Sequence, residues 1–243
     1  MAKKYVEGAK PLRDRNRTGR SIDIKRIFFY EMYKTGEDPY LYSPYRIVGK
    51  LIDGDVILDS FDLMWTPPPE SCPPSQEWIN GSSIIMKELD DLQTSEEAFS
   101  RFIRPFRRFL DYILPNKRVI LCGFGNHGDD DIMFKRWFSE NTEAWEYGKI
   151  FYPLSMDLMG ASSVCMADVV SNVGGIDLAW AAGVALRYVD LTKMNDPMYR
   201  IDTMIKLYRS RFSPNLNIHT IRMMDGNIFK YSSKLTNLRR GNI

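Results

Sequence analysis

The chain has 243 residues, of which 44% are hydrophobic and 26% charged, and this composition is that of a globular protein with a sizeable core rather than a disordered chain. Three cysteines without paired spacing and two histidines argue against a disulfide framework or a Cys/His zinc site. No apolar run approaches the roughly 20 residues that span a bilayer, and the first 20 residues lack the apolar middle of a signal peptide. We therefore expect an intracellular protein without membrane contact.

The net charge of +2 conceals a strong asymmetry along the sequence. Residues 1–20 carry a net charge of +5 and residues 206–243 a net charge of +7, so the stretch between them is acidic. Clustered Lys and Arg bind polyanions because the contacts release counterions. The basic ends therefore indicate contact with phosphate backbones or an acidic protein partner, and solvated tails that maintain solubility are the alternative. The arginines expected to bind nucleic acid are Arg13, Arg15, Arg17, Arg20, Arg239 and Arg240.

Three β-rich runs follow a basic arm of residues 1–23. They cover residues 24–33, 45–51 and 56–65, with turn signals at 35–39 and 53–55 between them. Short runs separated by such turns predict an antiparallel meander. A Pro-rich passage ends it, and a capping box at 94–97 then predicts a helix over 96–114.

The second half of the chain alternates predicted strands and helices. Strands are expected at 118–123 and 149–153, and helices at 129–139, 164–173 and 198–208. Strands first and helices between later strands predict an α/β fold with a mixed sheet, an antiparallel meander followed by parallel strands, flanked by helices. A turn signal at 224–227 between two apolar runs predicts a β-hairpin in the basic C-terminal extension, residues 212–243.

Carboxylates at three places in the sequence are candidate metal ligands. Hydrolysis of a phosphodiester by two metal ions needs three or four carboxylates, because Mg²⁺ prefers oxygen ligands and two ions must hold the attacking and leaving oxygens. One face of the first strand carries Phe29, Glu31 and Tyr33, of which only one is an acid. The other candidates are Asp129, Asp130 and Asp131 at a strand-to-helix turn, and Asp196 and Asp202 near the last core helix. Acids that only cap a helix and complement its dipole are the alternative.

The order of these pieces resembles the DEDD family of 3′–5′ exonucleases, which includes proofreading subunits of DNA polymerases and oligoribonucleases. Residues 28–39 (FFYEMYKTGEDP) are similar to the family's Asp-x-Glu strand and its Thr-Gly-x-Asp-Pro turn. Asn126 and Asp130 stand where the family's second motif has Asn and Asp. The resemblance spans about residues 24–208 and implies an RNase H-like exonuclease domain over 24–211, with Mg²⁺ or Mn²⁺ as cofactor if the protein is active.

The first and last motifs of the family are substituted in this sequence. Without a gap, Glu31 stands at the family's Asp and Tyr33 at its Glu, whereas with a two-residue insertion Phe29 replaces the Asp and Glu31 keeps the Glu. In the last motif, Asn195 and Arg200 stand at the general-base His and the final Asp. Shifting that frame by two residues recovers Asp202 as a ligand but puts Pro197 at the His. Each register lacks at least one residue of the family's site.

Arg200 would place a fixed cation where a metal ion should lie, and its charge could neutralise Glu31 and Asp130. The resemblance therefore implies an exonuclease-fold protein that binds nucleic acid or a nucleic-acid-processing partner, in replication, repair or RNA processing, with impaired or absent catalysis. One alternative is an active exonuclease on single-stranded DNA or RNA that uses Glu31, Asp130 and Asp202, with Glu31 and Asp130 as metal ligands. The other is a structural subunit of a larger assembly.

Overall fold

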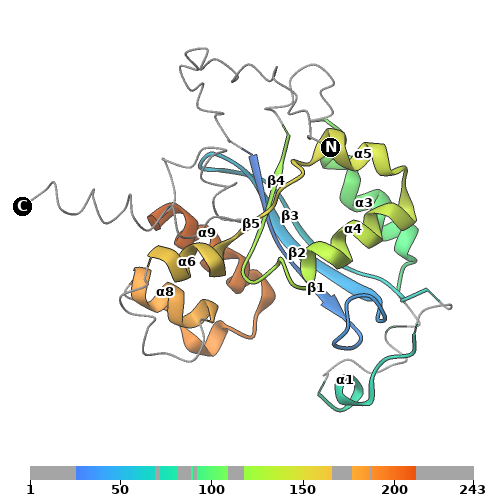
Figure 1. The fold of residues 1–243 in the computed structure, drawn as a ribbon, viewed down its shortest axis with the longest axis horizontal. Coiled ribbons are helices and arrows are strands. Elements are labelled where there is room, and N and C mark those ends of the chain that lie inside the picture. The colour runs from blue at the N-terminus through green and yellow to red at the C-terminus, as the bar shows by residue number, and fades with distance from the viewer. Residues whose placement is uncertain are drawn as a thin grey trace, which may run out of the picture.

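The computed structural model describes residues 26–68, 72–81, 89, 92–108, 118–165, 177–186 and 188–211. Its centre is a five-stranded sheet with the order β3-β2-β1-β4-β5 (Figure 1). The strands are β1 (Arg26–Lys34), β2 (Pro44–Asp53), β3 (Val56–Met64), β4 (Ile120–Gly123) and β5 (Met156–Asp157). The first three form an antiparallel meander, and β4 and β5 join it in parallel. The predicted mixed sheet is confirmed.

Helices cover both faces of this sheet (Figure 1). One layer contains α3 (Ser95–Arg107), α4 (Asp130–Asn141) and α5 (Ala144–Ile150). The other contains α6 (Leu158–Cys165), α8 (Leu178–Leu186) and α9 (Pro197–Arg211). A short helix, α1 (Gln76–Gly81), follows the meander, and a 3₁₀ turn, Leu191–Lys193, precedes α9. Within the part of the chain that the structure describes, no helix is long and apolar enough to cross a membrane.

The alternation of β1 decides which helix layer each of its side chains meets, because successive residues of a strand point to opposite faces. Phe28 packs against Phe102 of α3, with ring centroids 5.5 Å apart. Phe29 packs on the opposite face against Tyr208 of α9, also at 5.5 Å. Glu31 has the same parity as Phe29, so its side chain faces α9.

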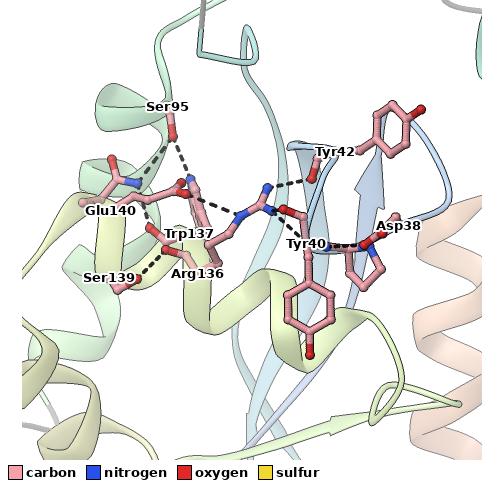
Figure 2. Close-up of polar contacts among 10 residues, drawn as sticks. Asp38, Tyr40, Tyr42, Ser95, Arg136, Trp137, Ser139 and Glu140 are labelled. Carbon is pink, nitrogen blue, oxygen red and sulfur yellow. Dashed lines mark hydrogen bonds and ion pairs between the residues drawn. The ribbon is translucent and has the colours of Figure 1, made fainter. Parts of the chain in front are cut away.

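The helices of the first layer are fixed by defined polar contacts as well as by aromatic packing. The predicted capping box at the start of α3 is present, with Thr94 and Glu97 each accepting the other's backbone N–H. Arg136 of α4 donates hydrogen bonds to the backbone oxygens of Pro39, Tyr40 and Tyr42 (Figure 2). This arginine clamp holds the connection between β1 and β2 against α4, directly after the strand that carries Glu31.

The expected strand at 149–153 is wrong. Residues 149–150 end α5, and Phe151 forms only an isolated bridge with Val119. Residues 147–151 form a helical turn in place of a strand. The N–H of Phe151 donates to the carbonyl of Tyr147, and the two rings pack on each other. The last strand is instead the two-residue β5.

The other helical expectations are met unevenly. The expected helix at 164–173 begins earlier, as α6, and residues 166–176 lie outside the described part. Helices α1, α5 and α8 were not expected from the sequence. The N-terminal arm and the predicted C-terminal hairpin also lie outside the described residues.

Candidate active site

The candidate residues gather where the parallel strands β1 and β4 end. Glu31 lies near the end of β1, and Asp129, Asp130 and Asp131 follow β4 at the start of α4. Carboxyl ends of parallel strands meet at one edge of a sheet, which is where open α/β sheets commonly place ligand sites. We call this set, Glu31 and the three aspartates, the carboxylate end.

Glu31 is bound by an arginine from the other end of the sequence. The Arg200 Nε lies 2.9 Å from Oε1 and 3.0 Å from Oε2 of Glu31, and a terminal guanidinium nitrogen lies 2.8 Å from Oε1. The Tyr33 hydroxyl donates to Oε2 at 3.0 Å. Glu31 is only 7% exposed, so this carboxylate depends on the arginine for its compensating charge. Hydrogen bonding to Glu31 raises the pKa of Arg200, and burial, then the charge of Glu31, raises the pKa of Tyr33.

Two other candidate acids each form an ion pair with a lysine. Lys34, at the end of β1, forms an ion pair with Asp129. Lys50, on β2, forms an ion pair with Asp202 of α9. Asp202 is therefore compensated by a lysine, and it is Arg200, two residues earlier on α9, that reaches Glu31.

Asp130 differs from its neighbours because it has no ion-pair partner among the described residues. Burial, and then the nearby charge of Glu31, raises the pKa of Asp130 well above its ordinary value. A hydrogen bond from the backbone of Met32 acts in the opposite direction but is a smaller effect. The site therefore disfavours the charged form of this carboxyl group relative to an exposed aspartate, which weakens it as a metal ligand.

Asp131 belongs to a buried hydrogen-bond network. It accepts hydrogen bonds from the hydroxyls of Tyr30 and Ser155 and, at 3.0 Å, from the side-chain amide of Asn126. These donors come from β1, from the residue before β5 and from the turn after β4. The carboxylate of Asp131 is 6% exposed and ties three strands to the start of α4.

The three consecutive aspartates thus have three different environments. Asp129 stands at the N-cap of α4 but makes no side-chain capping hydrogen bond, so of the capping interpretation only the proximity of the acids to the helix dipole remains. Asp196, by contrast, accepts the backbone N–H of Met198 at 2.9 Å, as a helix cap does. Asn195 lies exposed in the turn before α9, and no described contact brings it to Glu31.

Two residues near the carboxylate end were missed at the level of sequence. Asp157 of β5 accepts the backbone N–H groups of Gly125 at 2.7 Å and Met159 at 2.8 Å. It holds the turn after β4, in which Gly125 has a φ of 76° that disfavours other residues. Ser155, the donor to Asp131, is the other. Both come from a segment without a motif, so no local signal could have found them.

A cavity of about 880 Å³ lies beside the arginine clamp, between the β1–β2 connection and the start of α3. Its lining includes Tyr40, Leu41, Pro67, Pro68 and Arg136, and none of the predicted site residues. The cavity is therefore a feature separate from the carboxylate end.

The donor set at the carboxylate end does not fit a two-metal centre. Among the residues that the structure describes, no three His, Cys, Asp or Glu side chains group closely enough to hold a metal ion. Both oxygens of Glu31 already accept N–H groups of Arg200. The six arginines expected to bind nucleic acid lie outside the described residues.

Solved structures share this arrangement of strands and helices. Exonuclease I of E. coli in complex with a dA16 oligonucleotide matches with a TM-score of 0.59 at 16% identity, over 83% of this chain and 42% of that one. The chain shares its fold with exonuclease I. A zinc-bound complex of E. coli exonuclease I with single-stranded DNA matches with a TM-score of 0.56 at 14% identity, over 85% of this chain and 42% of that one.

Exonuclease I from Methylocaldum szegediense matches with a TM-score of 0.57 at 15% identity, over 77% of this chain and 41% of that one. The predicted RNase H-like exonuclease fold is thereby confirmed. This chain spans less than half the length of these structural relatives. No family model and no curated protein matches the sequence.

Proposed function

We propose that this chain is a pseudo-exonuclease: an intracellular protein that keeps the exonuclease fold to bind nucleic acid, or a partner that processes it, with impaired or absent catalysis. The observation that carries the proposal is the ion pair between Arg200 and Glu31. A guanidinium cannot deprotonate at physiological pH, so it remains beside this carboxylate as a fixed positive charge.

The surroundings of the ion pair support the same conclusion. Lys34 and Lys50 compensate Asp129 and Asp202, and burial together with the charge of Glu31 raises the pKa of Asp130. Side chains thus provide at the carboxylate end the positive charge that divalent ions provide in a two-metal nuclease. Nucleic-acid binding is supported by the basic ends of the sequence and by the fold shared with exonuclease I, which is known in complex with oligonucleotides.

Cleavage of a 3′-labelled single-stranded DNA and RNA oligomer with Mg²⁺ or Mn²⁺ tests the proposal. The purified protein is compared with Glu31→Gln and Asp130→Asn variants, and binding is measured in parallel. We expect no release of label, together with oligomer binding that weakens as salt rises. Release that both substitutions abolish would show an active exonuclease and overturn the proposal. A structural subunit, the remaining hypothesis, would neither cleave nor bind the oligomer.

A further inference from the structure

The end of the sheet opposite the carboxylate end gathers positive side chains. There β1 and β4 begin side by side, with Ile27 paired to Ile120, and β2 turns into β3. Arg209 near the end of α9 reaches this turn, donating to the backbone oxygen of Asp55 at 2.9 Å. The end of α5 also lies at this end of the sheet, because the carbonyl of Ile150 accepts the N–H of Val119 just before β4. We call the set Arg26, Arg104, Arg107, Arg108, Arg118 and Arg209 the arginine end.

The cations of this end are only partly compensated. Arg26, Arg107 and Arg209 pair with Asp53, Glu146 and Asp55, respectively. Arg104 and Arg118 have no carboxylate partner among the described residues, and the Nε of Arg118 is buried without a hydrogen-bond partner there. Arginines in the last turn of a helix complement its dipole, which accounts for Arg104 and Arg107. It does not account for Arg118, which lies two residues before β4.

Both basic segments of the sequence connect to this same end. Residues 1–20, with a net charge of +5, lead into β1 at Arg26. Residues 212–243, with a net charge of +4, follow α9, whose last turns lie at Asp55. In the register of the meander, Arg26 is paired with Asp53, two residues from Asp55. The described residues that adjoin the two segments, the start of β1 and the end of α9, therefore both lie at the arginine end.

An exposed aromatic ring lies next to these arginines. Trp145 of α5 is 54% exposed, and the Nζ of Lys149 lies 3.9 Å from its ring centroid. The adjacent Glu146 is the residue that binds Arg107 of α3. An exposed indole beside cations is a stacking platform for an unpaired base.

We infer that the arginine end is the surface on which this protein holds single-stranded nucleic acid. The inference rests on the nucleic-acid binding of the proposed function and places that binding away from the carboxylate end. At the carboxylate end, Lys34 and Arg200 are already paired with acids, whereas at the arginine end Arg104 and Arg118 have no acidic partner within the described part of the chain. The phosphates are held by charge, and Trp145 stacks on one base.

The test measures the affinity of the full chain for a fluorescent dT20 oligomer at several salt concentrations. The variant reverses two exposed charges, Arg104→Glu with Arg108→Glu. The control, Lys135→Glu with Lys193→Glu, reverses the same number of exposed charges on α4 and on the 3₁₀ turn before α9, neither of which carries a residue of the arginine end. Melting curves check that all variants fold.

We expect the double reversal to weaken binding at least about tenfold, with a slope of log K against log salt that is shallower by roughly 0.7 for each phosphate that the variant no longer neutralises. The control should stay within about twofold of the unmodified chain, because its two reversed charges lie outside the arginine end. Trp145→Ala should weaken single-stranded binding more than duplex binding, since only unpaired bases can stack on the indole.

Three outcomes would overturn the inference. If the double reversal and the control weaken binding equally, only the total charge matters and the arginine end is not the contact surface. If polyglutamate of matched charge competes as well as the oligomer, the surface binds acidic polymers in general. If the full chain binds no oligomer, the proposed function fails with it, whereas binding that all variants keep overturns the inference alone.

Discussion

The carboxylate end and the arginine end lie at opposite ends of the same strands, β1 and β4, and share helix α9, yet they use charge in opposite ways. At the carboxylate end, Glu31 is buried and bound by Arg200, and Asp131 is enclosed by hydrogen-bond donors. At the arginine end, Arg104 is exposed and has no acidic partner among the described residues. Charges compensated inside the molecule stabilise or strain the fold, whereas uncompensated surface charges are available to external anions. Substitutions at the first end should therefore change stability, and those at the second should change binding.

The largest effect is expected from Arg200→Ala. Removing the guanidinium leaves Glu31 buried without its compensating charge, which should lower the free energy of unfolding by about 2–4 kcal/mol, since a third of the arginine side chain remains exposed to water. Urea denaturation measures the change. The double variant Glu31→Gln, Arg200→Met should recover most of the loss, because neither charge remains. A double variant as unstable as Arg200→Ala alone would show that packing, rather than charge, explains the effect.

Asp131→Ala should destabilise nearly as much, by about 2–3 kcal/mol, because it leaves the buried hydroxyl of Tyr30 and the amide of Asn126 without their acceptor. Thermal melting checks the size. Asp131→Asn, which keeps one carbonyl acceptor, should cost less. If alanine and asparagine are equally tolerated, the network does not contribute to stability.

Asp130→Asn should stabilise the protein in a pH-dependent way. The folded-state pKa of Asp130 is raised above the unfolded value, so ionisation costs stability as pH rises from the unfolded towards the folded pKa. Asparagine cannot ionise and removes that cost. The gain in Tm should be smallest near the ordinary pKa of an aspartate, about pH 4, and should grow as the pH rises from there. A constant difference across this range would contradict the raised pKa.

The smallest effect on stability is expected at the arginine end. Arg107→Ala removes an ion pair with Glu146, but the arginine side chain is 51% exposed, so the loss should stay below about 1 kcal/mol. The same variant should weaken oligomer binding measurably. A loss of stability comparable to that of Arg200→Ala would contradict the expectation that substitutions at the arginine end change binding rather than stability.

Periodicity and turn chemistry predicted the meander, α3, β4, α4 and α9, because each of these elements buries its own regular apolar pattern. They failed at α5 and β5, where Tyr147 and Phe151 pack as a helical pair and the last strand has only two residues. Glu31, Asp130 and Arg200 were identified from motif spacing.

The partners of the site residues were not predictable in the same way. The lysines that bind Asp129 and Asp202 come from separate strands, and Ser155 comes from a segment without a motif. These side chains come together only in the folded protein, so no local sequence pattern predicts their contacts.

The ion pair between Glu31 and Arg200 also restricts how this sequence can change over generations. Loss of the arginine alone leaves an unpaired buried carboxylate, and loss of the glutamate alone leaves a half-buried guanidinium without its partner. A change that introduced an acid at position 200 would place two carboxylates together without a compensating charge. The two positions are therefore expected to be replaced together or not at all.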